Sequence, residues 1–140
     1  MKQKIALMGA VLALGAWQQL TPQTTRSVWE GIYSKVQAAK GAGLYAQECA
    51  SCHGTMLTGG ESAPPLAGGD FLSNWEGLTI GDLFERIRTT MPATRPGALN
   101  REINAAVLAY ILEMNQYPSG AAELQQQTEF LKQIVLDKKP

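Results

Sequence analysis

The sequence predicts an all-α domain in which three main helices are joined by long loops. Apolar residues recur at helical spacing in three segments, and no strand pattern precedes Cys49. Between Gly54 and Leu78 this periodicity disappears, and pairs of Gly and Pro residues take its place. The chain has 140 residues, of which 45% are hydrophobic and 17% charged, ordinary values that leave no room for a second large core.

The first predicted helix runs from Ser34 to about Ser51, a segment rich in the good helix formers Ala, Lys, Gln and Glu. Gly41, Tyr45 and Cys49 follow one another at four-residue steps along one face. Glycine weakens a helix interior by roughly 0.5–1 kcal/mol relative to alanine. Gly41 therefore indicates either close approach of another backbone or an incidental surface glycine.

Two further helices have clear start signals. Thr79 and Asp82 form an [ST]xx[DE] start, and the helix that follows is expected to end near Thr90. Its apolar positions are Ile80, Leu83, Phe84 and Ile87. Asn100 is a good N-cap for the last main helix, which stops before Pro118. One apolar stripe is expected on it, formed by Ile103, Ala106, Val107, Tyr110, Ile111 and Met114.

The other segments are less regular. Residues 54–78 predict a long ordered loop, a feature that is uncommon in a compact domain unless the loop wraps something functional. Between Ala121 and Leu136, the apolar residues Leu124, Leu131 and Val135 stand at spacings of seven and four. This tail is expected to form a further helix or a strap across the domain.

The pentapeptide Cys49-Ala50-Ser51-Cys52-His53 contains both cysteines and the only histidine of the chain, at the spacing of a c-type haem attachment site. On a helix, the two thiols and the imidazole would face one side about 5–6 Å apart. The thiols can then form thioethers with the vinyl groups of haem, while the imidazole binds iron. We expect one haem c, attached through Cys49 and Cys52, with His53 as the proximal ligand.

Three other interpretations compete for this motif. A structural zinc site normally has four Cys or His ligands, and this chain offers three without a second cluster. A thioredoxin-like dithiol would require a βαβ context, which the flanking sequence lacks. A plain disulfide leaves the adjacent histidine unexplained.

The second axial ligand is predicted by elimination among the methionines. Met56 lies only three residues beyond His53, and Met114 belongs to the apolar stripe of the last helix. Met91 precedes Pro92, which favours an extended or turn conformation from which a thioether can reach iron. The alternative is a gap-filling Met91, with the iron site open or bound by lysine.

The N-terminal segment resembles an export signal. Lys2 and Lys4 precede an apolar run from Ile5 to Trp17, too short for an ordinary membrane span. We expect residues 1–25 to be a signal or an uncleaved anchor, residues 26–118 the haem-binding domain and residues 119–140 a C-terminal extension. Membrane contact is then expected only through an uncleaved N-terminal segment, and a periplasmic location follows from export.

Charge gives no support for nucleic-acid binding. The chain has twelve basic and twelve acidic residues, so without Lys2 and Lys4 its net charge is −2. Four arginines surround Met91 in sequence: Arg86, Arg88, Arg95 and Arg101. They could form a docking rim for an acidic partner, but helical spacing favours ion pairs of Asp82 with Arg86 and of Glu85 with Arg88.

The combined pattern resembles the class I cytochromes c over roughly residues 34–117. The matching features are Gly41-x3-Tyr45-x3-Cys49-x2-Cys52-His53, Ala63-Pro64-Pro65-Leu66-Ala67-Gly68, Met91-Pro92 and the helix bearing Tyr110. Ala63 stands where the family has glycine. The loop from Ala63 to Trp75 and the tail are more similar to bacterial cytochrome domains found alongside quinoprotein dehydrogenases.

This resemblance implies the class I cytochrome c fold, with long loops wrapped around one covalently bound haem. It also implies that the first helix crosses the last one where Gly41 meets the neighbourhood of Tyr110. The carbonyl of Pro64 is implied to accept a hydrogen bond from His53, and Trp75 to lie beside a haem propionate. For Trp75, a core position with its N–H bonded to backbone is the alternative.

His/Met ligation suits outer-sphere electron transfer and disfavours binding of small molecules at iron. The expected function is that of a periplasmic electron carrier rather than an enzyme. It would exchange single electrons between a dehydrogenase or membrane redox complex and a downstream acceptor, either as a free carrier or as the electron-transfer subunit of a dehydrogenase. A gas- or peroxide-binding haem protein and a disulfide-linked binding module without haem are the two other hypotheses.

Overall fold

The computed structural model describes residues 25–140, so the predicted signal at residues 1–25 lies almost entirely outside the described residues. The fold is all-α, as predicted, and its three longest helices are α1 (Lys35–Glu48), α4 (Ile80–Thr90) and α5 (Arg101–Met114). The shorter elements are β1 (Arg26–Ser27), the 3₁₀ helix η1 (Val28–Glu30), α2 (Ala50–His53), α3 (Gly69–Trp75), α6 (Thr128–Leu131) and β2 (Ile134–Val135). In this part of the chain, no helix has both the length and the apolar character needed to cross a membrane.

The start of each long helix is fixed by local side-chain caps, which the sequence predicted at Thr79 and Asn100 but not at Ser34. The Ser34 hydroxyl accepts the backbone N–H of Gln37, and the Asn100 side chain accepts that of Ile103. Thr79 and Asp82 form a reciprocal capping box at α4. These caps satisfy backbone N–H groups that have no partner within the first helical turn.

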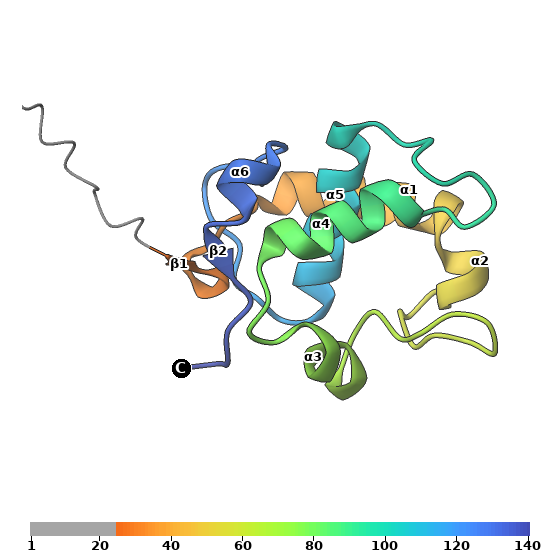
Figure 1. The fold of residues 1–140 in the computed structure, drawn as a ribbon, viewed down its shortest axis with the longest axis horizontal. Helices are drawn as coiled ribbons and strands as arrows, with labels where there is room; N and C mark the ends of the chain where they lie inside the picture. The colour runs from red at the N-terminus through yellow and green to blue at the C-terminus, as the bar shows by residue number, and fades with distance from the viewer. Residues whose placement is uncertain (1–24) are drawn as a thin grey trace, which may run out of the picture.

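The first helix was predicted to continue to about Ser51, and this extent is wrong. It ends at Glu48 because the backbone of Cys49, at φ −126° and ψ −36°, departs from helical geometry. A separate one-turn helix, α2, then carries the rest of the motif. The break turns Cys52 and His53 onto a new axis at one end of the molecule (Figure 1).

Close backbone contact explains Gly41. A Cβ at this position would lie 1.8 Å from the carbonyl oxygen of Ala106, so α1 and α5 cross where no side chain fits. The rings of Tyr45 and Tyr110 pack beside this crossing with their centroids 5.4 Å apart. The crossing expected near Tyr110 is therefore present.

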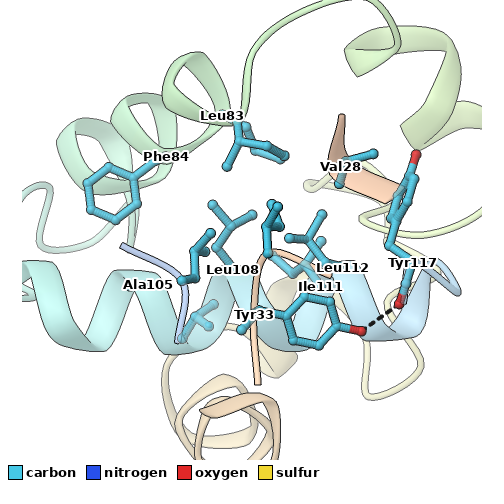
Figure 2. Packing of buried hydrophobic residues seen from close by; sticks show 14 of the residues in the cluster. Val28, Tyr33, Leu83, Phe84, Ala105, Leu108, Ile111, Leu112 and Tyr117 are labelled. Carbon is cyan, nitrogen blue, oxygen red and sulfur yellow. Dashed lines mark hydrogen bonds between the residues drawn. The ribbon is translucent and has the colours of Figure 1, made fainter. Parts of the chain in front are cut away.

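Helix α5 is buried on more sides than the single predicted stripe. Asn104, Ala105, Leu108, Ala109 and Leu112 are buried in addition to the stripe. Figure 2 shows the cause, since side chains from the N-terminal segment, from α4 and from Tyr117 surround this helix. The Tyr33 hydroxyl also donates to the carbonyl of Tyr117 at 2.6 Å.

The segment 54–78 was predicted to lack regular structure, and this prediction is wrong in its second half. Helix α3 begins after Gly68, whose φ of 82° and ψ of −162° redirect the chain. Phe71 is fully buried, while Leu72 and Trp75 pack against the core. Their helical spacing was a usable signal, but it spans only one turn and two glycines precede it.

The tail forms a strap, here defined as residues 119–138, that lies across the domain. Strand β2 pairs with β1 in parallel, with Ile134 opposite Arg26. Leu124, Leu131 and Leu136 are buried, whereas Val135 is only partly covered. The helical pattern in the sequence selected Val135 as an inward position. Because this segment pairs as a strand, its inward positions are instead Ile134 and Leu136.

Candidate haem site

A cavity of about 650 Å³ lies against α2, the loop after it, α3, α4 and α5. Every site residue predicted from the sequence lines it: Cys49, Cys52, His53, Pro64, Trp75 and Met91. Apolar side chains form much of the remaining wall, namely Leu66, Leu78, Leu83, Ile87, Val107 and Ile111. The tertiary structure thus collects residues spread over more than forty positions of sequence into one site.

The two thiols are held by the junction between α1 and α2. The carbonyl of Cys49 accepts the backbone N–H groups of Cys52, at 3.2 Å, and of His53, at 3.0 Å. No disulfide joins the two cysteines; Cys49 is partly buried and Cys52 is exposed. Burial, with a smaller contribution from the Glu48 charge, raises the pKa of Cys49 to about 11. Before haem is attached, the Cys49 thiol is therefore neutral at physiological pH.

His53 presents one ring nitrogen to the cavity. Its side chain is buried, and Nδ1 lies 2.8 Å from the carbonyl oxygen of Pro64. A carbonyl oxygen can only accept, so Nδ1 carries a proton, and Nε2 is the ring nitrogen that can bind a metal. A histidine that binds a metal is commonly oriented in this way by a second group.

The loop that carries Pro64 is shaped by glycine. Gly59 has a φ of +75°, and a Cβ there would lie 2.7 Å from the backbone nitrogen of Pro65. The N–H of Gly59 donates to the carbonyl of His53 at 2.9 Å. Further along, Leu66 donates to Leu57 at 2.8 Å and closes the loop. These contacts place the Pro64 carbonyl beside the imidazole.

Met91 stands at the end of α4. Its backbone N–H still donates to the carbonyl of Ile87 at 2.9 Å, but its own φ of −117° and ψ of 154° are extended. Met91 lines the cavity, whereas Met56 is 65% exposed and Met114 packs against the core. Among the methionines of residues 25–140, Met91 is therefore the one that lines the cavity.

Arg86 is a site residue that sequence reasoning missed. The predicted ion pair with Asp82 is wrong, because the Asp82 carboxylate instead accepts from Thr79 at the helix start. The second predicted pair, Glu85 with Arg88, is present at 2.6 Å. Arg86 lines the cavity, and none of the ion pairs among residues 25–140 includes it. Its spacing from Leu83, three residues earlier, was the available signal.

The residues present fit a c-type haem. The cavity volume falls within the roughly 300–1,000 Å³ typical of cofactor sites, and its wall combines apolar side chains with a few polar groups. Two thiols, an imidazole with a free Nε2 and a thioether are the donor set that such a haem requires. Within residues 25–140, no three His, Cys, Asp or Glu side chains converge as ligands of one metal ion, so the zinc alternative gains no support.

Comparison with known proteins agrees with this chemistry. Residues 36–111, more than half of the chain, match the family model described as cytochrome C oxidase, cbb3-type, subunit III. The fold is similar to that in the crystal structure of the sulfane dehydrogenase SoxCD from Paracoccus pantotrophus, with a TM-score of 0.51 and 24% sequence identity. The match covers 95% of this chain and 68% of the other. No curated protein matches the sequence.

Proposed function

Because the chain belongs to the cytochrome c family described as cytochrome C oxidase, cbb3-type, subunit III, we propose that it carries single electrons on one covalently bound haem c. The observation that carries this proposal is the orientation of His53. Its Nδ1 donates to Pro64 at 2.8 Å, which leaves Nε2 free within a cavity that also receives both thiols and Met91. No competing interpretation of the motif accounts for all four groups.

Each residue has a separate task in this proposal. When bound, haem supplies a one-electron iron couple. Cys49 and Cys52 would hold the porphyrin edge as thioethers, and His53 would bind iron through Nε2. Met91 would bind iron through its thioether sulfur, which would disfavour small molecules at iron. Trp75 and Arg86, which line the same cavity, are the polar groups that can face the propionates.

The same proposal includes location and partners. The basic and apolar pattern of residues 1–17 supports export, and thioether formation with haem takes place outside the cytosol in this class of protein. We therefore place the protein in the periplasm, with membrane contact only if the N-terminal segment is retained. Its partners would be a dehydrogenase or membrane redox complex as donor and a second redox protein as acceptor. It would act either as a free carrier or as the electron-transfer subunit of a dehydrogenase.

The test is expression of the full chain in a host competent in cytochrome maturation. We expect haem stain to stay with the polypeptide through denaturing electrophoresis and to be absent from the Cys49→Ser/Cys52→Ser variant. The oxidised protein should show a far-red Met–iron charge-transfer band that Met91→Leu removes and Met56→Leu, the matched control, retains. A colourless protein with two free thiols would overturn haem attachment, and a high-spin spectrum would favour a gas- or peroxide-binding protein.

A further inference from the structure

We propose that Glu85 is a positioning residue for Met91, because it fastens the outer face of α4 to the C-terminal strap and to α5. This inference rests on the proposed function, in which Met91 binds iron. It gives the C-terminal extension, which lies outside the segment matched by the family model, a specific role at the haem site.

Helix α4 makes contacts on two faces, one toward the cavity and one toward the strap. Leu83, Arg86 and Ile87 line the cavity. On another side, a Cβ at Gly81 would lie 2.5 Å from Cγ and 2.7 Å from the backbone nitrogen of Lys132, so the strap backbone packs directly against the helix. The position of α4, and with it that of one cavity wall, is therefore set from the strap side.

Glu85 is the polar centre of this contact. Its carboxylate accepts from Arg88 Nη2 at 2.6 Å and from the Thr128 hydroxyl of α6 at 2.5 Å. Nη2 of Arg101, at the start of α5, lies 3.6 Å away. One carboxylate thus joins α4, α5 and α6.

Arg101 extends the connection along the strap. Its Nη1 donates to the Gln126 carbonyl at 2.8 Å and to the Thr128 hydroxyl at 3.1 Å. Its guanidinium also lies over the Phe84 ring, 5.7 Å from the ring centroid. The strap is therefore held by directional bonds as well as by apolar packing, which limits sliding along α4.

Displacement at Glu85 would be transmitted to Met91 through an unbroken helix. The two residues are six positions apart, about 9 Å along the axis at 1.5 Å per residue. The helix continues through Thr90, and the N–H of Met91 still donates to Ile87. A rigid helix converts a small rotation at Glu85 into a comparable movement of the thioether.

The other ion pair on the Met91 side is a weaker candidate for this role. Arg95 bonds Glu48 at 2.5 Å, but the Arg95 side chain is 56% exposed. Exposed ion pairs contribute little because solvent and salt screen them. The carboxylates are similarly exposed, Glu48 at 26% and Glu85 at 28%, but Glu85 has three partners where Glu48 has Arg95.

The experiment measures how readily imidazole displaces Met91 from iron in the oxidised holoprotein. We expect Glu85→Gln and Thr128→Ala to raise the apparent affinity for imidazole about tenfold and to weaken the Met–iron band, with haem attachment unchanged. A tenfold change corresponds to about 1.4 kcal/mol of lost positioning. Thr128→Ser, which keeps the hydroxyl, should behave as the parent protein.

Glu102→Gln is the matched control, because the ion pair of Glu102 with Lys40 joins α1 to α5 and includes no residue of α4. Parent-like imidazole affinity in both Glu85→Gln and Thr128→Ala would overturn the inference, as would an equal rise in Glu102→Gln. If Glu85→Gln does not fold, the comparison of Thr128→Ala with Thr128→Ser tests the inference by itself. Failure of the proposed function is distinguishable, because the parent protein would then lack haem or the Met–iron band.

Discussion

The two ends of the molecule are built on different principles. At one end lie α2 and the loops around it (Figure 1). They border the cavity, whose wall is completed by residues suited to a haem. At the other end, β1, β2 and α6 close against the helices by contacts of the polypeptide alone. Leu131 and Leu136 are fully buried there without any cofactor.

This difference shows that the family segment and the folding unit are not the same. Residues 36–111 match the family model, yet Val28, Tyr33, Leu124 and Leu131 belong to the same core. Ser27 and Trp29 also bond to Asp137, across more than a hundred residues of sequence. The flanking segments are therefore structural parts of the domain, and one face of α4 depends on them.

The largest effect is expected at the strap. Leu131→Ala removes a fully buried side chain and should lower the free energy of unfolding by about 2–5 kcal/mol, the usual range for such truncations. Denaturant unfolding of the holoprotein measures it. Phe130→Ala, in the same short helix but at a side chain 55% exposed, is the control and should cost less. Equal costs would mean that the strap is an appendage rather than part of the core.

A smaller loss of stability is expected at the cavity end from Gly59→Ala. The positive φ of Gly59 and the 2.7 Å approach to Pro65 predict a cost of about 1–3 kcal/mol. Because this loop holds the Pro64 carbonyl, the yield of protein with attached haem should also fall. Gly69→Ala has open space and no positive φ, so it should match the parent in both unfolding and haem yield. A normal haem yield in Gly59→Ala would contradict the role given to the loop.

Lowering the pH should weaken the contacts that Glu85 makes with the strap. Hydrogen bonding to Arg88, and then to Thr128, lowers the pKa of Glu85 from 4.5 to about 2. A depressed folded-state pKa contributes stability above pH 4.5 that is lost as the pH falls toward 2. The difference in unfolding free energy between the parent and Glu85→Gln should therefore shrink over this interval. A constant difference from pH 5 to pH 2 would show that the carboxylate charge is not what stabilises the contact.

The smallest effect is expected from Arg86→Gln. A positive charge beside the cavity favours the reduced iron, so its removal should lower the reduction potential slightly, given that Arg86 is exposed and screened by solvent. Arg26→Gln removes the same charge at β1, far along the chain from the cavity, and serves as the control. Voltammetry measures the reduction potential of both variants, and equal shifts would show that Arg86 does not act at the haem site.

Because it depends on local interactions, a large part of this structure could be predicted from the sequence. The predicted caps at Thr79 and Asn100, and the motif from Cys49 to His53, depend on residues three or four positions apart. Such contacts form within one helical turn whatever surrounds them. For the same reason, the boundaries of α4 and α5 were predicted closely.

Long-range packing decided what the sequence did not show. Helix α3 is held by burial of Phe71, and the end of the strap by pairing of β2 with β1, partners that no local pattern identifies. Arg86 faces the cavity because Asp82 is engaged by Thr79 and because α5 and the strap set the rotation of α4. Spacing along a chain limits which residues can share a face, but the direction in which that face points depends on contacts between distant segments.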